Sequence, residues 1–151
     1  MTRSRLHLAA VPNLLLALLG LVLLAGCATS GQTYSQLQTN LSPPAEGQGR
    51  IFIYRTIVLG AAVQPSVKVN DTVVGSAVPR GFFYIDRPAG DYTISTATEV
   101  TRTLSLTLTP GQVRYVRLNI GMGFFVGHVW PELVDDSEGQ KDIADCHLVK
   151  S

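Results

Sequence analysis

Charged side chains are scarce in this sequence, and neither sign is in excess. They make up 15% of the 151 residues, with 12 basic and 11 acidic side chains, against about 25% in an average soluble domain. Arg3 and Arg5 are the charged residues before position 27, so the remainder holds 10 basic and 11 acidic residues, a formal charge of −1. Nucleic-acid binding by phosphate neutralisation needs a clustered basic excess. We therefore expect no nucleic-acid partner.

Residues 1–26 have the composition of a secretory signal peptide. Arg3 and Arg5 form a short positive segment, and residues 14–24 (LLLALLGLVLL) form an uninterrupted apolar run. Such a run spans about 16 Å as a helix, roughly half of a hydrocarbon core. A permanent membrane span would therefore have to extend across Pro12 and Asn13.

The end of this segment, Leu24-Ala25-Gly26-Cys27, resembles the lipobox of bacterial lipoproteins. The resemblance implies cleavage between Gly26 and Cys27, acylation of the Cys27 thiol and of the new amino terminus with chains such as palmitate, and anchoring in a bacterial membrane. Two or more acyl chains hold a membrane stably, whereas one does so only marginally. Ala28, rather than Asp, follows the cysteine, which favours the outer membrane with the domain facing the periplasm. The lipid is the only cofactor expected.

Cysteine is almost absent. The sequence has two cysteines, and acylation of Cys27 leaves Cys146 without a partner for an intramolecular disulfide. We interpret Cys146 as a buried thiol that acts as a small apolar side chain.

The mature chain is predicted to have two parts. Residues 27–49 comprise the acylated cysteine and a Ser-, Thr-, Gln-, Gly- and Pro-rich stretch that carries one charge, Glu46, which predicts a flexible tether. Residues 50–151 are predicted to form the folded domain. Its alternating apolar and polar segments, separated by Gly and Pro turns, predict about seven strands. The segments are 50–55, 66–70, 72–75, 81–85, 91–96, 103–109 and 113–120.

These strands predict an all-β fold, a two-sheet antiparallel β-sandwich of the immunoglobulin or transthyretin type. Leu104, Leu106 and Leu108 alternate with polar residues and are expected to face the interior. Residues 135–147 are compatible with a short C-terminal helix or with a strand and a turn.

Several segments, in this order, resemble a family of small bacterial lipoproteins, the domain-of-unknown-function family 2846. The segments are Gly49–Arg55, Val67–Asp71, Phe83-Tyr84, Pro88–Tyr92 and Pro110–Arg117, together with the lipobox. The resemblance covers about Gly49 to Leu148 and implies a β-sandwich on a lipid tether, with no catalytic residues to carry over. One departure is Asn70-Asp71, where Asn-Gly is usual at the hairpin turn.

Candidate catalytic and metal-binding residues are few. Cys146 with His128 or His147 is the only nucleophile and base combination that we consider, and adjacent side chains such as Cys146 and His147 diverge on either a strand or a helix. The set His128, Cys146, His147 and Asp142 or Asp145 matches no zinc-binding spacing, so we expect no metal site. The glycines of residues 121–127 lack the Lys-Ser/Thr sequence of a phosphate-binding loop.

Two surfaces are candidates for binding a partner. Residues 121–130 combine three glycines with Phe124, Phe125 and Trp130. They form either a bulged connection whose aromatic rings plug the open end of the sandwich, or an exposed apolar flap that meets a partner, a second copy or the lipid headgroups. The other candidate is Arg114, Tyr115 and Arg117, near Arg102 in sequence. These residues form either a cationic and aromatic face for an acidic glycan or peptide, or an ordinary solvated strand face.

The sequence therefore favours a non-enzymatic envelope lipoprotein whose sandwich binds or assembles with an envelope protein or glycan. The alternative is a periplasmic enzyme that depends on a thiol or a histidine and uses Cys146 with His128 or His147.

Overall fold

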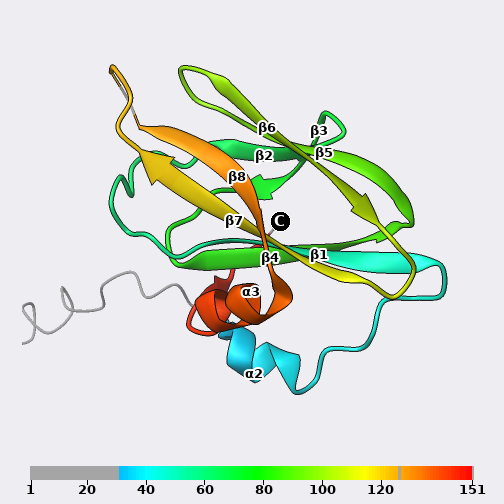
Figure 1. Ribbon diagram of the computed structural model, residues 1–151. Helices are drawn as coiled ribbons and strands as arrows, with labels where there is room; N and C mark the ends of the chain where they lie inside the picture. Colours follow the sequence, from blue (N-terminus) through cyan, green and yellow to red (C-terminus); the bar gives the residue numbers. More distant parts are fainter. Residues whose placement is uncertain (1–30, 126, 151) are drawn as a thin grey trace, which may run out of the picture. The chain divides into compact units, whose positions relative to one another are not determined.

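The computed structural model describes residues 31–125 and 127–150, so the predicted signal peptide, its cleavage site at Gly26 and the acylation site at Cys27 lie outside the described residues. The described chain folds into two packed sheets (Figure 1). One sheet has five strands in the order β8-β7-β1-β4-β9, and the other has four in the order β3-β2-β5-β6. The strands are β1 (Gln48–Arg55), β2 (Ser66–Val69), β3 (Thr72–Ser76), β4 (Gly81–Pro88), β5 (Gly90–Ala97), β6 (Thr101–Leu108), β7 (Val113–Gly121), β8 (His128–Val134) and β9 (His147–Leu148).

The two-sheet sandwich is confirmed, with two corrections. The described residues form nine strands, because β8 and β9 add to the seven expected. The sheet is not wholly antiparallel, since β1 pairs with β7 in parallel and β4 pairs with β9 in parallel. The chain crosses between the sheets after β1, β3, β4 and β6, and residues 135–146 separate β8 from β9, so that the partners in each parallel pair are distant in sequence. Periodicity within a strand carries no information on such pairings.

Strand β1 is apolar on both faces because both faces are covered. Ile51 and Ile53 are fully buried in the core between the sheets. Phe52 and Tyr54, on the opposite face, pack into a second cluster beneath helices α2 (Tyr34–Gln38) and α3 (Asp136–Ile143). Figure 1 shows both helices against the outer face of the five-stranded sheet. Helix α3 confirms the C-terminal helix.

The segment expected to be a flexible tether is folded from residue 31 onward. Thr33 caps α2 with a reciprocal capping box, and Tyr34 is 4% exposed. Leu37 and Leu41 pack against the second cluster. Tyr34 and Leu37 are spaced so that they share one face of α2, and Leu41 follows the end of the helix. A segment this short forms a stable helix only where tertiary packing supports it, and here the outer face of the sheet provides the packing surface.

The predicted hairpin at Asn70-Asp71 is present between β2 and β3. Both residues have positive φ, 45° at Asn70 and 65° at Asp71. This is the pattern of a two-residue type I′ turn. Asn70 adopts the positive φ that this turn requires. Its Oδ1 also accepts a hydrogen bond from the backbone N–H of Thr93 at 2.9 Å.

Candidate functional site

The connections at one end of the sandwich lie together, and we call this the loop end. Strand β1 ends there at Arg55, β4 begins opposite it at Gly81, and β7, parallel to β1, runs on to Gly121. The β5–β6 turn reaches the same end because Val67, near the start of β2, pairs with Thr96. The loop end therefore comprises residues 56–65, 77–80, 98–100, 122–125 and 127, and it lies to the left in Figure 1.

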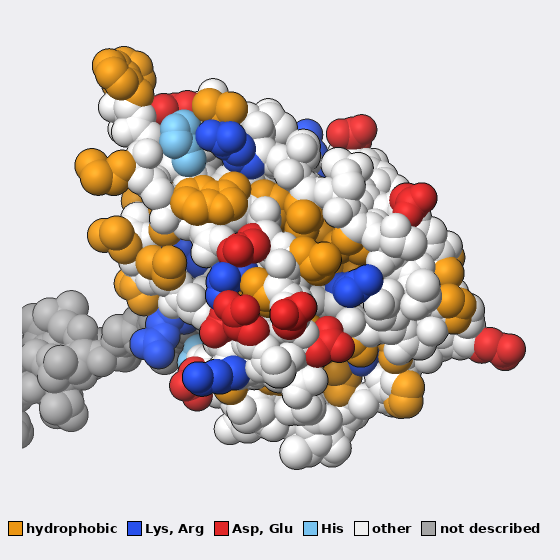
Figure 2. All heavy atoms as spheres, in the orientation of Figure 1, with side chains coloured by type: hydrophobic (Ala, Val, Ile, Leu, Met, Phe, Trp, Pro, Cys, Tyr) orange, Lys and Arg blue, Asp and Glu red, His pale blue; other side chains and the backbone are white. Residues whose placement is uncertain are grey.

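Large apolar side chains are exposed at the loop end. Met122 is 96% exposed, Phe124 87%, Phe125 86% and Leu59 78%. Figure 2 shows apolar side chains projecting from this side of the molecule. Phe124 and Phe125 do not plug the sandwich, so that interpretation of residues 121–130 is wrong. The segment is an exposed apolar tip between β7 and β8.

The β7–β8 tip is held in place by an acid from the other sheet. The Glu99 carboxylate, on the β5–β6 turn, accepts hydrogen bonds from the backbone N–H groups of Phe124, at 3.0 Å, and Phe125. The Nε2 atom of His128 lies 3.7 Å from the same carboxylate. Because two successive backbone N–H groups are bound, the tip has a defined backbone. Its two phenyl rings meet edge to face with centroids 4.7 Å apart.

Residues 56–65 form the second apolar loop, and a buried arginine shapes it. Arg55 is 0% exposed and donates hydrogen bonds to backbone carbonyls rather than to a carboxylate. The acceptors are the carbonyl oxygens of Ile57, Leu59, Gly60, Val63 and Ala77. A Cβ atom at Gly60 would lie 2.5 Å from Cδ1 of Ile120, near the end of β7. The two apolar loops are therefore neighbours.

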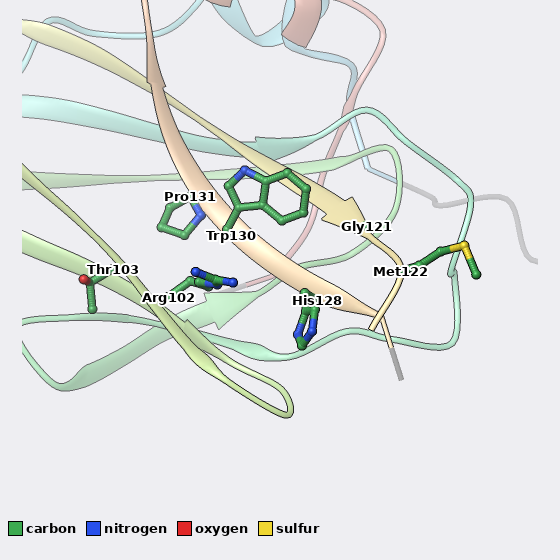
Figure 3. A pocket seen from close by; sticks show the side chains of 7 residues that line it. All are labelled: Arg102, Thr103, Gly121, Met122, His128, Trp130 and Pro131. Atoms are coloured by element: carbon green, nitrogen blue, oxygen red, sulfur yellow. The ribbon is translucent and has the colours of Figure 1, made fainter. Parts of the chain in front are cut away.

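An open groove of about 550 Å³ runs beside the tip. Figure 3 shows Arg102, His128 and Trp130 grouped around it, with Met122 toward the tip. Trp130 is 37% exposed. The groove combines an indole, a guanidinium and an imidazole, side chains that can bind a planar or anionic group.

The predicted cationic and aromatic face on β7 does not form. Tyr115 is 2% exposed, stacks on Phe52 with ring centroids 5.3 Å apart, and shares a hydrogen bond with the Tyr34 hydroxyl. Tyr115 does point away from the sandwich interior, as expected, but α2 and α3 cover that side. Arg114, its neighbour along the strand, lies on the opposite face. Arg102 belongs to the groove at the loop end.

Arg117 is bound by acids of this chain. Its guanidinium contacts the carboxylates of Glu132 at 2.9 Å, Glu138 at 2.6 Å and Asp142 at 2.8 Å, which joins β7 to β8 and α3. Burial lowers the pKa of Arg117, but the three carboxylates together outweigh it and raise that pKa. The same pairing, with a hydrogen bond from Asn119, lowers the pKa of Glu132. Arg117 therefore fastens α3 to the sheet.

The predicted thiol and histidine combination is not assembled. Cys146 is 3% exposed, its Sγ lies 3.9 Å from the carbonyl oxygen of Arg55, and burial raises its pKa to about 11. His128 lies on β8 and His147 on β9, at opposite edges of the five-stranded sheet. Nδ1 of His147 is 3.1 Å from the carbonyl oxygen of Gly31. Cys146 is thus the buried thiol that the sequence suggested.

No group of three or more His, Cys, Asp or Glu side chains in residues 31–125 and 127–150 could hold a metal ion. Over the same residues, no helix is long and apolar enough to cross a membrane.

Leu59, Arg55 and Glu99 contribute to the loop end, and the sequence reasoning missed all three. Residues 56–65 (TIVLGAAVQP) contain no charge and several apolar residues, a signal that could have identified an exposed apolar loop. No local pattern indicates the role of Glu99, because its carboxylate accepts hydrogen bonds from backbone N–H groups that lie 25 and 26 residues later in the sequence.

Comparison with known proteins places the chain in a family. The model of a protein family of unknown function, DUF2846, matches residues 45–129, more than half of the sequence. An uncharacterised protein of Haemophilus influenzae is 29% identical over 134 residues, which cover 86% of this chain and 80% of that protein. The N-terminal domain of AlgF from P. aeruginosa aligns at 21% identity with a TM-score of 0.43, covering 62% of this chain and 96% of that domain. The chain belongs to the DUF2846 family.

Proposed function

We propose that this chain is a lipoprotein of the bacterial cell envelope, anchored by acyl chains on Cys27, with a sandwich that binds an envelope component rather than catalysing a reaction. The observation that carries the proposal is the sequence Leu24–Cys27 at the end of the apolar run of residues 14–24. Acylation at that position would leave a domain that begins only a few residues later. The outer membrane, with the domain in the periplasm, is the expected location.

The binding role is supported by the chemistry of the loop end. The groove beside Trp130 offers an indole and the Arg102 guanidinium in the same open site. An envelope protein or an acidic glycan could use both groups. The enzyme alternative has less support, because the Cys146 thiol is buried with a raised pKa and its neighbour His147 contacts Gly31.

The anchor can be tested with a matched pair of cysteine variants, because the sequence has two cysteines. Cells that express the protein are fed an alkyne analogue of palmitate, and the protein is isolated and tagged through the alkyne. Label should be retained in Cys146→Ala and lost in Cys27→Ser. Fractionation should place the labelled protein in the outer membrane. Equal labelling of Cys27→Ser and the unaltered chain would contradict the proposal.

The binding role has its own test. A photo-crosslinking amino acid replaces Thr103, which lines the groove, and, as a control, Asp91 at the opposite end of the sandwich. Irradiation of living cells should give a discrete adduct, a protein or a glycan, from position 103 but not from position 91. Identical adduct patterns at the two positions would contradict a binding groove.

A further inference from the structure

We propose that the loop end is a membrane-contacting surface, in which Leu59, Met122, Phe124 and Phe125 enter the boundary between headgroups and acyl chains of the bilayer that holds Cys27. This inference rests on the proposed acylation of Cys27. It adds a second contact between domain and membrane, made by side chains rather than by the lipid.

Gly31, the first described residue, lies next to β9. Its carbonyl oxygen is 3.1 Å from Nδ1 of His147, and Thr33 forms an isolated β-bridge with His147. His147 pairs with Gly81, and Gly81 pairs with Arg55, the last residue of β1. Gly31 therefore lies at the loop end, the same end as the apolar tips.

Only three residues lie between Gly31 and the proposed anchor at Cys27. Four peptide units separate the Cα atoms of Cys27 and Gly31, and an extended chain of that length reaches at most about 14 Å. A free tether through residue 49 would have kept the domain farther from the bilayer, but residues 31–49 are folded onto it. An acylated Cys27 would hold the loop end close to the lipid surface.

The side chains of the loop end suit contact with lipid. Residues 56–65 and 122–127 contain no charged side chain, and their exposed members include Leu59, Met122, Phe124 and Phe125. Aromatic and aliphatic side chains on protruding loops suit the membrane interface. A patch of this kind exposed to water would otherwise favour aggregation.

The charges around the loop end agree with an anionic lipid surface. Arg80 and Arg102 are exposed at its margin, where they can reach lipid phosphates. Of the acids at this end, Glu99 binds the backbone of the tip and Asp145 lies at the sheet edge before β9. The opposite end of the sandwich differs, with exposed Glu46 and Asp91 in or beside its turns.

The test places a single indole at each end of the sandwich in turn. Trp130→Phe removes the one native tryptophan. Phe124→Trp then reports on the tip. Ala89→Trp, at an exposed position in the β4–β5 turn, reports on the opposite end. The full mature protein is purified with its anchor and reconstituted into vesicles of phosphatidylethanolamine and phosphatidylglycerol, with or without bromine on the acyl chains.

Brominated lipid should quench the indole of Phe124→Trp several-fold more than that of Ala89→Trp. Equal quenching of the two, or none at the tip, would overturn the inference. If the fluorescence emission of the indole at the tip is shifted to the blue but not quenched, and sedimentation shows a dimer, the inference would be overturned. The loop end would then contact a second copy of the chain.

The acyl content of Cys27 is measured on the same samples, so that the two proposals can fail separately. Acylated Cys27 without quenching at the tip would overturn the membrane contact alone. Unmodified Cys27 would overturn the anchor and, with it, the reason for placing the loop end on lipid. Circular dichroism and thermal melting should match the unaltered protein for both indole variants, because positions 89 and 124 are exposed.

Discussion

The hydroxyl oxygens of Tyr34 and Tyr115 lie 2.8 Å apart and share a hydrogen bond across 81 residues of sequence. Tyr34 also meets the Phe52 ring edge to face, with centroids 5.2 Å apart. These contacts bind the first helix of the described chain to the outer face of the five-stranded sheet. The segment around Tyr34 is therefore part of the folded domain.

Substitutions at Tyr34 should therefore affect stability in proportion to the contacts they remove. Tyr34→Phe loses the hydrogen bond and should cost about 1 kcal/mol of unfolding free energy. Tyr34→Ala also removes the buried ring and should cost about 3–4 kcal/mol. Gln38→Ala, at an exposed position of the same helix, should change it by less than about 0.5 kcal/mol. Urea denaturation measures all three, and an unchanged midpoint for Tyr34→Ala would show that this segment is not part of the folded unit.

Arg55 should be essential for the shape of the apolar loop 56–65. Arg55→Lys keeps the charge, but a single ammonium cannot reach the five carbonyl oxygens that the guanidinium binds. We expect a loss of about 3 kcal/mol, because buried acceptors lose their donors. Arg87→Lys, at a partly exposed position of β4, is the control. Comparable melting temperatures for the two variants would contradict this role of Arg55.

The carboxylates around Arg117 should make the attachment of α3 sensitive to acid. Arg117 and Asn119 lower the pKa of Glu132 below its ordinary value of 4.5. A lowered folded-state pKa contributes stability that is complete above pH 4.5 and is lost as the pH falls through the folded-state value. Glu132→Gln should lose up to about 1 kcal/mol near neutral pH, since the pair is partly solvated. Its melting temperature should then fall less than that of the unaltered protein between about pH 7 and about pH 3.

A steeper acid dependence in Glu132→Gln would contradict this account. Gln38→Ala is the control, because it removes an exposed side chain and changes no titratable group. Its acid dependence should match that of the unaltered protein.

Cys146 should be unreactive while the protein is folded. Burial raises the pKa of its thiol to about 11, and the thiolate is the reactive form. In a Cys27→Ser background, iodoacetamide at about pH 8 should modify the folded protein at least about 100-fold more slowly than the urea-unfolded chain. Cys146→Ala should retain binding and localisation. Rapid modification of the folded protein would restore the thiol-enzyme hypothesis.

Strand periodicity predicted most of the sandwich correctly. Leu106 and Leu108 are buried and Leu104 packs partly against the core, as the alternation in residues 103–109 indicated. Residues 51–54 are apolar on both faces, and β1 is a central strand that is covered on both sides. The pattern could not identify what covers each face. Tyr115 was placed on the correct side of β7 but was expected to be solvated, because nothing local to β7 signals that α2 and α3 pack there.

The candidate site was predicted only in part. Phe124, Phe125 and Trp130 were identified from composition, but their exposure depends on Glu99, a residue distant in sequence that binds the backbone of the tip. Grouping Arg114 with Tyr115 and Arg117 overlooked the alternation of side chains along a strand. Leu59 was missed because loop 56–65 has no periodicity. This loop lies beside the β7–β8 tip because β1 and β7 pair in parallel and therefore end on the same side of the sheet.

The intact mass of the protein extracted from its native membrane tests the central claim most directly. The account predicts a chain that begins at Cys27 and carries the added mass of a diacylglyceryl group and an acyl chain on its amino terminus. A chain that retains residues 1–26, or one that begins at Cys27 with no added mass, would contradict it.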